Sequence, residues 1–289
     1  MTILLGILSA LSFGIGDFLA RFSSKEVGFK NSLFWMLVVG AIFYLILFYI
    51  KETYFFSEGL NPNSIGLSNS FLSGILIMFG LLFLYRGLQM GPVSIVAPIV
   101  ATNPFFVFLI RFFLGSEPSL TQWISTLVVI SGAILISISA ENFKSSLGMN
   151  GKQIKESIAI SFMSSGMLAI GLIFTQEAST TMGDLETVIY IRFFSLFGIA
   201  VLLLFTRSKI TLTKKAIPFL FFQGILETTG YFCLVSAYAV DKESIAVVIS
   251  SAFGLVTAVL ARIFLKEKIS KIQSAGIFLT CSGVVGLLI

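Results

Sequence analysis

The chain has no histidine, only two cysteines and few charged side chains: 11% of its 289 residues are Asp, Glu, Lys or Arg. The lack of histidine excludes histidine-based metal sites, Ser-His-Asp chemistry and histidine proton relays. Cys233 and Cys281 both lie inside apolar runs, where cysteine acts as a small hydrophobic residue. Because a soluble domain carries about 25% charged residues, an ordinary cytosolic enzyme and a secreted disulfide scaffold are both excluded.

The chain is rich in hydrophobic residues, which make up 56% of it and include 31 phenylalanines. A helix needs about 20 mostly apolar residues to cross a bilayer. Runs of this kind occupy 2–22, 32–50, 70–90, 92–114, 120–140, 156–176, 187–206, 216–239, 244–265 and 272–289. The run 33–50 is apolar on every side, so it fits a helix and not a barrel strand of alternating polarity. We therefore predict an all-α membrane protein with ten transmembrane helices.

The basic residues predict the orientation of these helices. Most of the 19 Lys and Arg residues lie in or beside every second loop, beginning with the loop after the first run. They lie between apolar runs and do not form a continuous face, so nucleic-acid binding is disfavoured. The positive-inside rule makes this side cytoplasmic and predicts that both termini face outward. We expect a multi-pass protein of the inner (plasma) membrane.

An internal repeat divides the chain into two halves. The segment RFFLGSEPSLTQ around Arg111 is echoed by RIFLKEKISKIQ around Arg262, at an offset of about 150 residues. The predicted units are a first five-helix repeat at 1–140, a cytoplasmic linker at 141–155 and a second five-helix repeat at 156–289. Since five is odd, the two repeats must cross the membrane in opposite directions. Inverted repeats are typical of secondary transporters whose substrate site lies near the midplane between the halves.

These features resemble the EamA family of the drug/metabolite transporter superfamily. The resemblance rests on ten runs in two halves, each half with a glutamate after its fourth run, Glu117 or Glu267, and a Ser-Gly pair in its fifth. The proline-bearing run GPVSIVAPIVATNPFFVFLI and Arg192, early in the seventh run, also match the family. The resemblance implies a basket of ten helices and transport of small metabolites by alternating access. Many relatives are described with cytoplasmic termini, whereas the charges here predict the reverse.

Glu227 is the strongest single signal for a site. It lies about 16 Å along the eighth run, near the centre of a hydrocarbon core of about 30 Å. A carboxylate at that depth is costly and should face the bundle interior. Gln223 and Tyr231 lie four residues before and after it, on the same helix face. The group is either a protonatable or cation-binding carboxylate or a protonated, hydrogen-bonded structural glutamate.

Asp17 and Arg21 lie four residues apart near the cytoplasmic end of the first run, in the favourable order for an ion pair. We expect a local pair, with a ligand group at the cavity mouth as the alternative. Residues 14–17 read GIGD, as in intramembrane aspartyl proteases. Those enzymes need a second aspartate in the membrane, and the other two, Asp184 and Asp241, are predicted to lie in loops. The glycines are therefore expected to allow close helix contact.

Three further residues are candidates for substrate contact. Asn103 lies between Pro98 and Pro104, where a discontinuous helix is expected at mid-depth. Trp35 has a polar ring edge, and Arg192 could bind an anionic group. The predicted substrate-binding set is Glu227, Gln223, Tyr231, Asn103, Asp17, Trp35 and Arg192.

The sequence predicts a secondary transporter of a small polar metabolite and not an enzyme. A carboxylate with aromatic neighbours suits an amine, a quaternary ammonium or an amino acid. No cofactor is implied, and no phosphate-binding loop is present. Without histidine, proton coupling would run through Glu227. The expected partners are the small-molecule substrate, the lipid bilayer and, for a coupled transporter, protons. A channel or a non-transporting membrane scaffold is the alternative, and the oligomeric state stays open.

Overall fold

The computed structural model describes residues 2–55, 63–117, 119–142, 151–240, 249–267 and 269–287, and within them the chain forms helices joined by turns. The first half contributes α1 (Thr2–Val27), α2 (Phe29–Phe55), α3 (Ser64–Met90), α4 (Val93–Val100), α5 (Asn103–Phe113) and α6 (Leu120–Asn142). The second half contributes α8 (Gly151–Met182), α9 (Asp184–Phe205), α10 (Ile217–Val240), α12 (Phe253–Phe264) and α13 (Lys271–Gly286). Part of the expected linker is thus helical, and residues 143–150 of it lie outside the described residues.

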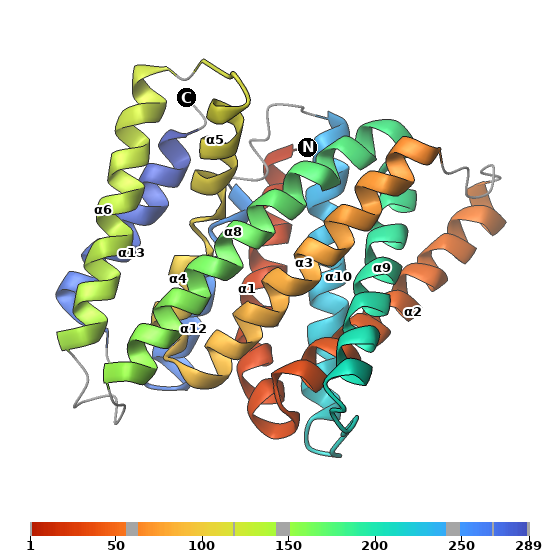
Figure 1. Cartoon of the computed structure of the whole chain (residues 1–289), viewed down its shortest axis with the longest axis horizontal. Helices are drawn as coiled ribbons and strands as arrows, with labels where there is room; N and C mark the ends of the chain where they lie inside the picture. Colours follow the sequence, from red (N-terminus) through yellow and green to blue (C-terminus); the bar gives the residue numbers. More distant parts are fainter. Residues whose placement is uncertain are drawn as a thin grey trace.

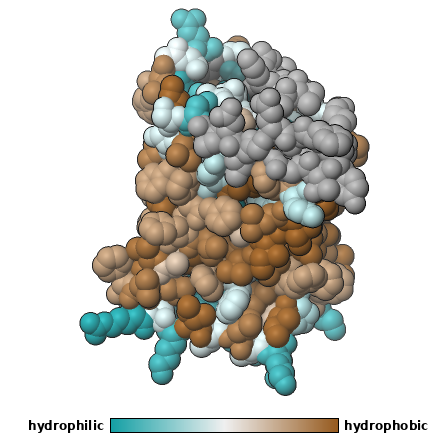
Figure 2. All heavy atoms as spheres, turned by 90° about the vertical axis from the view of Figure 1, so that its right-hand side faces the viewer, coloured by the Kyte–Doolittle hydropathy of each residue, from teal (hydrophilic) through white to brown (hydrophobic). Residues whose placement is uncertain are grey.

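The chain is a multi-pass membrane protein. Within the described residues, eight helical segments are long and apolar enough to cross a bilayer, with α4 and α5 together counted as one. In the described residues the last two expected spans are shorter than predicted, with 12 residues in α12 and 16 in α13. Figure 2 shows a broad apolar band across one face, with hydrophilic side chains below it. Exposed side chains such as Ile3, Leu45 and Phe197 suit a surface that faces lipid.

Small residues bring α6 and α13 together in antiparallel fashion. A Cβ added at Gly132 would meet the backbone of Thr280 and Gly276, and one at Gly283 would meet Val129. Later residues of α6 therefore contact earlier residues of α13, as two antiparallel helices do. In Figure 1 this pair lies with α5 on the left of the bundle, whereas α2 and α9 lie on the right. Glycine and threonine at the contact let the two backbones approach closely, which is how helices associate in lipid.

The central helices pack across the two halves. α3 packs on α8, where the Ser73 and Thr175 hydroxyls lie 2.7 Å apart and Ser164 donates to the carbonyl of Gly80 at 2.7 Å. α1 packs on α10, where Ser23 donates to Gln223 Oε1 at 2.7 Å. Both pairs are antiparallel. The third helix of each half thus lies against the first helix of the other half.

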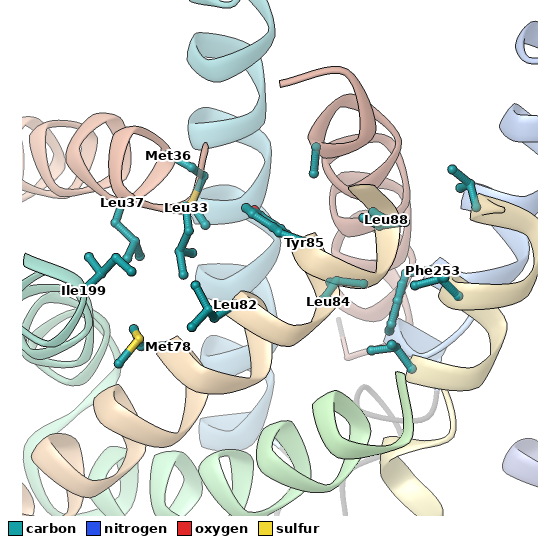
Figure 3. Close-up of a cluster of buried hydrophobic side chains, with 14 of the residues drawn as sticks. Leu33, Met36, Leu37, Met78, Leu82, Leu84, Tyr85, Leu88, Ile199 and Phe253 are labelled. Carbon is teal, nitrogen blue, oxygen red and sulfur yellow. The ribbon is translucent and has the colours of Figure 1, made fainter. Parts of the chain in front are cut away.

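Buried apolar side chains fill the bundle near the end where α1, α3 and α9 finish. Figure 3 shows Leu33 and Leu37 of α2, Leu82 and Tyr85 of α3 and Ile199 of α9 gathered there. We call the buried residues of this group the apolar plug: Ala20, Leu33, Met36, Leu37, Met78, Leu82, Leu84, Tyr85, Leu88, Val93, Val96, Val100, Ala101, Ile199, Leu203, Phe253 and Ala261. The same end carries the basic loops, where Lys30 donates to Thr206 at 3.1 Å. The start of α1 and the end of α13 lie at the opposite end (Figure 1).

The fourth span is broken, as predicted from its prolines. α4 ends at Val100, a turn occupies Ala101 and Thr102, and α5 begins at Asn103 with Pro104 next. The Thr102 hydroxyl donates to the Ile99 carbonyl at 2.7 Å and so caps part of the break. A second turn, at Ser251 and Ala252, precedes α12 at the corresponding place of the second half. No proline lies between 244 and 265, so the sequence did not predict this second break.

Candidate functional site

A cavity of about 80 Å³ lies at mid-depth in the bundle. Its wall draws on α1, α2, α3, α5, α8, α9, α10, Phe253 at the start of α12 and Ser250 before it, and so on both halves of the chain. Most of the wall is leucine, isoleucine and phenylalanine. The volume exceeds what one water molecule needs several-fold. The charged side chains of the wall are Asp17, Arg192 and Glu227.

Glu227 is buried in the bundle and lines this cavity, with only 4% of its surface exposed. Its carboxylate lies directly over Gly16 of α1, where an added Cβ would be 3.1 Å from Oε1. Within the described residues no hydrogen-bond donor reaches Oε1. Glu227 therefore faces the protein interior and not lipid, and it presents an unsatisfied acceptor at a depth where acceptors are costly.

Asp17 lies next to Glu227 across the contact between α1 and α10. The two carboxyl groups are within hydrogen-bonding reach of each other, and both line the cavity. Two acceptors at this separation, out of water, repel each other unless one proton lies between them. The arrangement is a carboxyl pair that can hold one proton.

The expected ion pair between Asp17 and Arg21 is wrong. Arg21 donates instead to the carbonyl oxygens of Leu88 and, at 3.0 Å, Gly91. These carbonyls lie at the end of α3, where the helix dipole favours a cation. Asp17 faces α10 instead. The two side chains therefore contact different helices, although they lie four residues apart on α1.

Arg192 of α9 lies on another side of the cavity and is 6% exposed. Its guanidinium donates to Met36 Sδ at 3.3 Å and to the Thr228 hydroxyl at 3.2 Å, and it lies 5.5 Å from the centre of the Tyr44 ring. Gly40 of α2 makes room for it, because a Cβ there would be 3.1 Å from the guanidinium carbon. The aromatic face partly stabilises the cation.

Asn103 and Tyr231 also line the cavity. Asn103 reaches it because the fourth span breaks just before this residue, which opens α5 at mid-depth. The Tyr231 hydroxyl lies 2.6 Å from the Thr175 hydroxyl, which orients the ring. Together with the three charged residues, five of the seven predicted binding residues meet at one cavity.

Gln223 and Trp35 are not part of the cavity wall. Gln223 is fully buried one turn from Glu227, with its Oε1 bonded to Ser23. The Trp35 ring nitrogen donates to the carbonyl of Thr211 at 3.0 Å, at the end with the basic loops. Trp35 packs beside Val27, Ala216 and Leu220. Its polar edge is thus used for structure, and we leave both residues out of the site.

Sequence reasoning missed several wall residues. Ser195 lies almost one turn after Arg192, and Ser250 and Phe253 flank the unpredicted turn before α12. Phe13 lies one turn before Asp17 and contacts Phe253 edge-on, with ring centres 6.3 Å apart. Phe13 and Ser195 could have been predicted, because their spacing places them on the same helix face as Asp17 and Arg192. Nothing in the sequence indicated the second break, and so Ser250 and Phe253 could not be predicted.

Comparison with known proteins agrees with this architecture. The sequence model of the EamA-like transporter family matches residues 1–138 and 157–289. An uncharacterized protein of Methanocaldococcus jannaschii is 35% identical over 138 residues, covering 47% of this chain and 96% of that protein. An uncharacterized transporter of Archaeoglobus fulgidus is 28% identical over 207 residues, covering 71% of this chain and 69% of that protein. The crystal structure of another protein superposes on this chain with a TM-score of 0.69 at 12% sequence identity, covering 99% of this chain and 95% of the other. The two proteins share a fold.

Proposed function

The chain belongs to the EamA-like transporter family, and from that premise we propose that it is a secondary transporter working by alternating access in the inner (plasma) membrane. Its cargo is a small polar metabolite with an amino or quaternary ammonium group. The observation that carries the proposal is the cavity at mid-depth, where Asp17, Glu227 and Arg192 meet in a wall made mostly of leucine, isoleucine and phenylalanine. Charged groups at this depth are costly to keep and mark substrate or ion sites.

Ten spans in two inverted repeats form the proposed mechanical frame. Support comes from α6 and α13, the last helix of each half, which run antiparallel. It also comes from the packing of α3 on α8 and of α1 on α10, in which the third helix of each half contacts the first helix of the other half. A turn glycine with positive φ joins the first two helices of each half, Gly28 at 85° and Gly183 at 87°. The proposed transport cycle rocks these halves about the cavity.

The apolar plug favours a transporter over a channel. It lies between the cavity and the end with the basic loops, and it includes fully buried Leu33, Tyr85 and Leu88. A channel needs a continuous polar path. In the described residues most of the cavity wall is leucine, isoleucine and phenylalanine, and the plug beyond it is apolar. Access from the basic end therefore requires the helices that form the plug to move apart.

The Asp17–Glu227 carboxyl pair is the proposed coupling site. One proton held between the two groups keeps a single negative charge there. A cation that enters the cavity competes with that proton for the same oxygens. Exchange of one for the other would couple substrate movement to the proton gradient without any histidine.

Flux into proteoliposomes tests this function. The assay compares wild-type protein, Glu227→Gln and the matched control Glu156→Gln, whose carboxylate forms a partly exposed ion pair with Arg86 at 2.8 Å. We expect Glu227→Gln to abolish uptake of labelled amines and amino acids while expression and melting temperature persist, and Glu156→Gln to transport normally. Full transport by Glu227→Gln would remove Glu227 from the mechanism. A non-transporting scaffold would show no flux of any probe in the wild type and would tolerate Glu227→Leu without a cell phenotype.

A further inference from the structure

One side chain of the apolar plug, that of Tyr85, carries a hydroxyl group. The Tyr85 ring is fully buried, and Figure 3 shows it directed from α3 toward α10. Its hydroxyl lies near the Gln223 amide and the carboxyl groups of Asp17 and Glu227. Within the described residues the hydroxyl has no hydrogen-bond partner. A buried polar group in this state is costly, and it indicates a bound water molecule or a function.

Two further buried polar atoms without a partner belong to the same group. They are the side-chain nitrogen of Gln223, which is fully buried, and Oε1 of Glu227. Gln223 lies one turn before Glu227 on α10. With the Tyr85 hydroxyl, these atoms provide a donor, an acceptor and a group that can act as either. A buried water molecule forms about three hydrogen bonds with groups of this kind.

A chain of hydrogen bonds holds the Gln223 amide in one orientation. Ser23 of α1 donates to Gln223 Oε1 at 2.7 Å, and the Ser23 and Ser32 hydroxyls lie 2.6 Å apart. A hydroxyl has a single proton, and Ser23 uses its proton on Gln223, so Ser32 is the donor in its contact with Ser23. Because Ser23 holds the amide oxygen, the two N–H donors of Gln223 are available to another partner.

The place of these atoms indicates a direction toward the basic loops. Tyr85 and Gln223 are not part of the described cavity wall. Tyr85 belongs to the plug, which separates the cavity from the basic end. Gln223 is connected through Ser23 to Ser32 in the first turn of α2, at that same end. The group therefore lies between the carboxyl pair and the basic end of the bundle.

The carboxyl pair has one exchangeable proton. Within the described residues the buried acidic and basic side chains are Asp17, Glu227 and Arg192. The buried tyrosines around them are Tyr44 of α2, Tyr85 of α3 and Tyr231 of α10, and tyrosine is neutral at ordinary pH. Arg21 of α1 is held by carbonyl oxygens at the end of α3. The proton of the pair thus has no other buried acid or base in the described residues to move to, and its release needs water.

From these contacts we infer that Gln223, Tyr85 and Glu227 bind one water molecule, and that the proton of the carboxyl pair leaves through this water toward the basic end. The water accepts from the Gln223 amide, donates to Glu227 Oε1 and contacts the Tyr85 hydroxyl. On release, the O–H bond of the Glu227 carboxyl group breaks and its proton passes to the bound water. That water passes one of its own protons to water that enters from the basic end when the helices of the plug move apart.

A cation in the cavity then takes the place of the proton, as in the proposed exchange. The inference rests on the proposed coupling function and adds the path that the proton takes. It gives Gln223 and Tyr85 a role in proton release and none in binding the cargo.

Infrared spectroscopy of the purified protein in lipid tests the water site without any substrate. Difference spectra are recorded between a pH at which the pair holds its proton and a higher pH at which it does not, in ordinary water and in water of the heavy oxygen isotope. We expect a band in the wild type that shifts with the isotope of the water, and its loss in Tyr85→Phe and in Gln223→Met. Absence of the band from the wild type overturns the inference, and so does its persistence in both variants.

The control for these spectra is Ser164→Ala. The buried hydroxyl of Ser164 donates to the carbonyl of Gly80 at 2.7 Å and is not part of the chain to Gln223, so the variant should keep the band. Tyr85→Phe removes one oxygen atom and keeps the ring. It therefore decides the question if Gln223→Met, which leaves Ser23 without its acceptor, fails to fold.

Two modes of flux in proteoliposomes test the path of the proton. Labelled leucine and labelled isoamylamine are the probes, and uptake driven by a pH gradient is compared with counterflow at equal pH. Counterflow exchanges one cargo molecule for another and needs no release of the proton. We expect Tyr85→Phe and Gln223→Met to lower gradient-driven uptake at least about tenfold and to leave counterflow close to that of wild type, whereas Ser164→Ala should change neither mode.

The flux outcomes separate this inference from the proposed function. Equal losses in both modes indicate a structural role for Tyr85 and Gln223 and overturn the inference, and so do variants that match wild type in both modes. Gradient-driven uptake by wild type together with either of these results leaves the proposed transporter intact. The water band in wild type without flux of either probe supports the water site and contradicts the proposed function.

Discussion

The carboxyl groups of Asp17 on α1 and Glu227 on α10 lie within hydrogen-bonding reach of each other at mid-depth in an apolar helix bundle. Gly16 makes the approach possible, because it leaves the space that the Glu227 side chain fills. The two residues belong to different halves of the chain. Relative movement of the halves would therefore change the pair directly, which links the site to the proposed transport cycle.

Gly16→Ala tests the closeness of this pair. The added Cβ would be 3.1 Å from Glu227 Oε1 and 3.4 Å from its Cγ, so the glutamate must shift by a few tenths of an ångström. Since the shifted group is the end of a flexible side chain, we expect the melting temperature to stay within about 2 °C of wild type. Transport should fall at least about tenfold, because a misplaced site group acts on the rate. Gly166→Ala is the control, as its added Cβ meets nothing within 4 Å; equal transport by both variants would contradict the prediction.

Gly132→Val tests the contact between α6 and α13. An added Cβ would lie 2.6 Å from the Thr280 backbone nitrogen and 2.7 Å from the Gly276 carbonyl oxygen, and backbone atoms cannot turn aside as a side chain does. Overpacking of this kind costs about 1–3 kcal/mol. We expect the melting temperature of the purified protein to fall by about 5 °C. Gly166→Val should leave it nearly unchanged, and a stable Gly132→Val protein would show that the two helices tolerate separation.

Glu267→Ala tests the anchoring of α4. The backbone N–H groups of Val93 and Ser94 donate to the two carboxylate oxygens of Glu267 at 3.0 and 2.9 Å. N–H groups at the start of a helix have no acceptor within the helix, and a negative charge is favourable there. Loss of such a cap costs about 0.5–2 kcal/mol, so the melting temperature should fall. Glu267→Gln keeps one acceptor and should lie between the alanine variant and wild type; an order in which glutamine is worse than alanine would contradict the capping role.

The sequence predicted the helical class, the broken fourth span and the burial of Glu227 because each depends on nearby residues. Apolar runs specify helices in lipid, and Pro98 and Pro104 remove backbone donors at known places. The prediction for Asp17 and Arg21 failed because it considered one helix alone. In the structure Arg21 donates to carbonyl oxygens at the end of α3, and Asp17 lies against Glu227 of α10. Spacing within one helix could not indicate either contact. Trp35 also has a partner that local spacing could not indicate, since its ring nitrogen donates to the carbonyl of Thr211.

Composition and the rise of a helix were enough to predict that this chain crosses a bilayer and that Glu227 lies near the middle of that bilayer. Which polar groups meet there was decided only by packing between helices. Asp17, Arg192 and Glu227 come from α1, α9 and α10, and apolar runs look alike on every side. The facing of each helix is set by small residues such as Gly16 and Gly40, whose effect depends on the shape of the partner helix. That shape exists only after the bundle has formed, and so the site belongs to the tertiary structure.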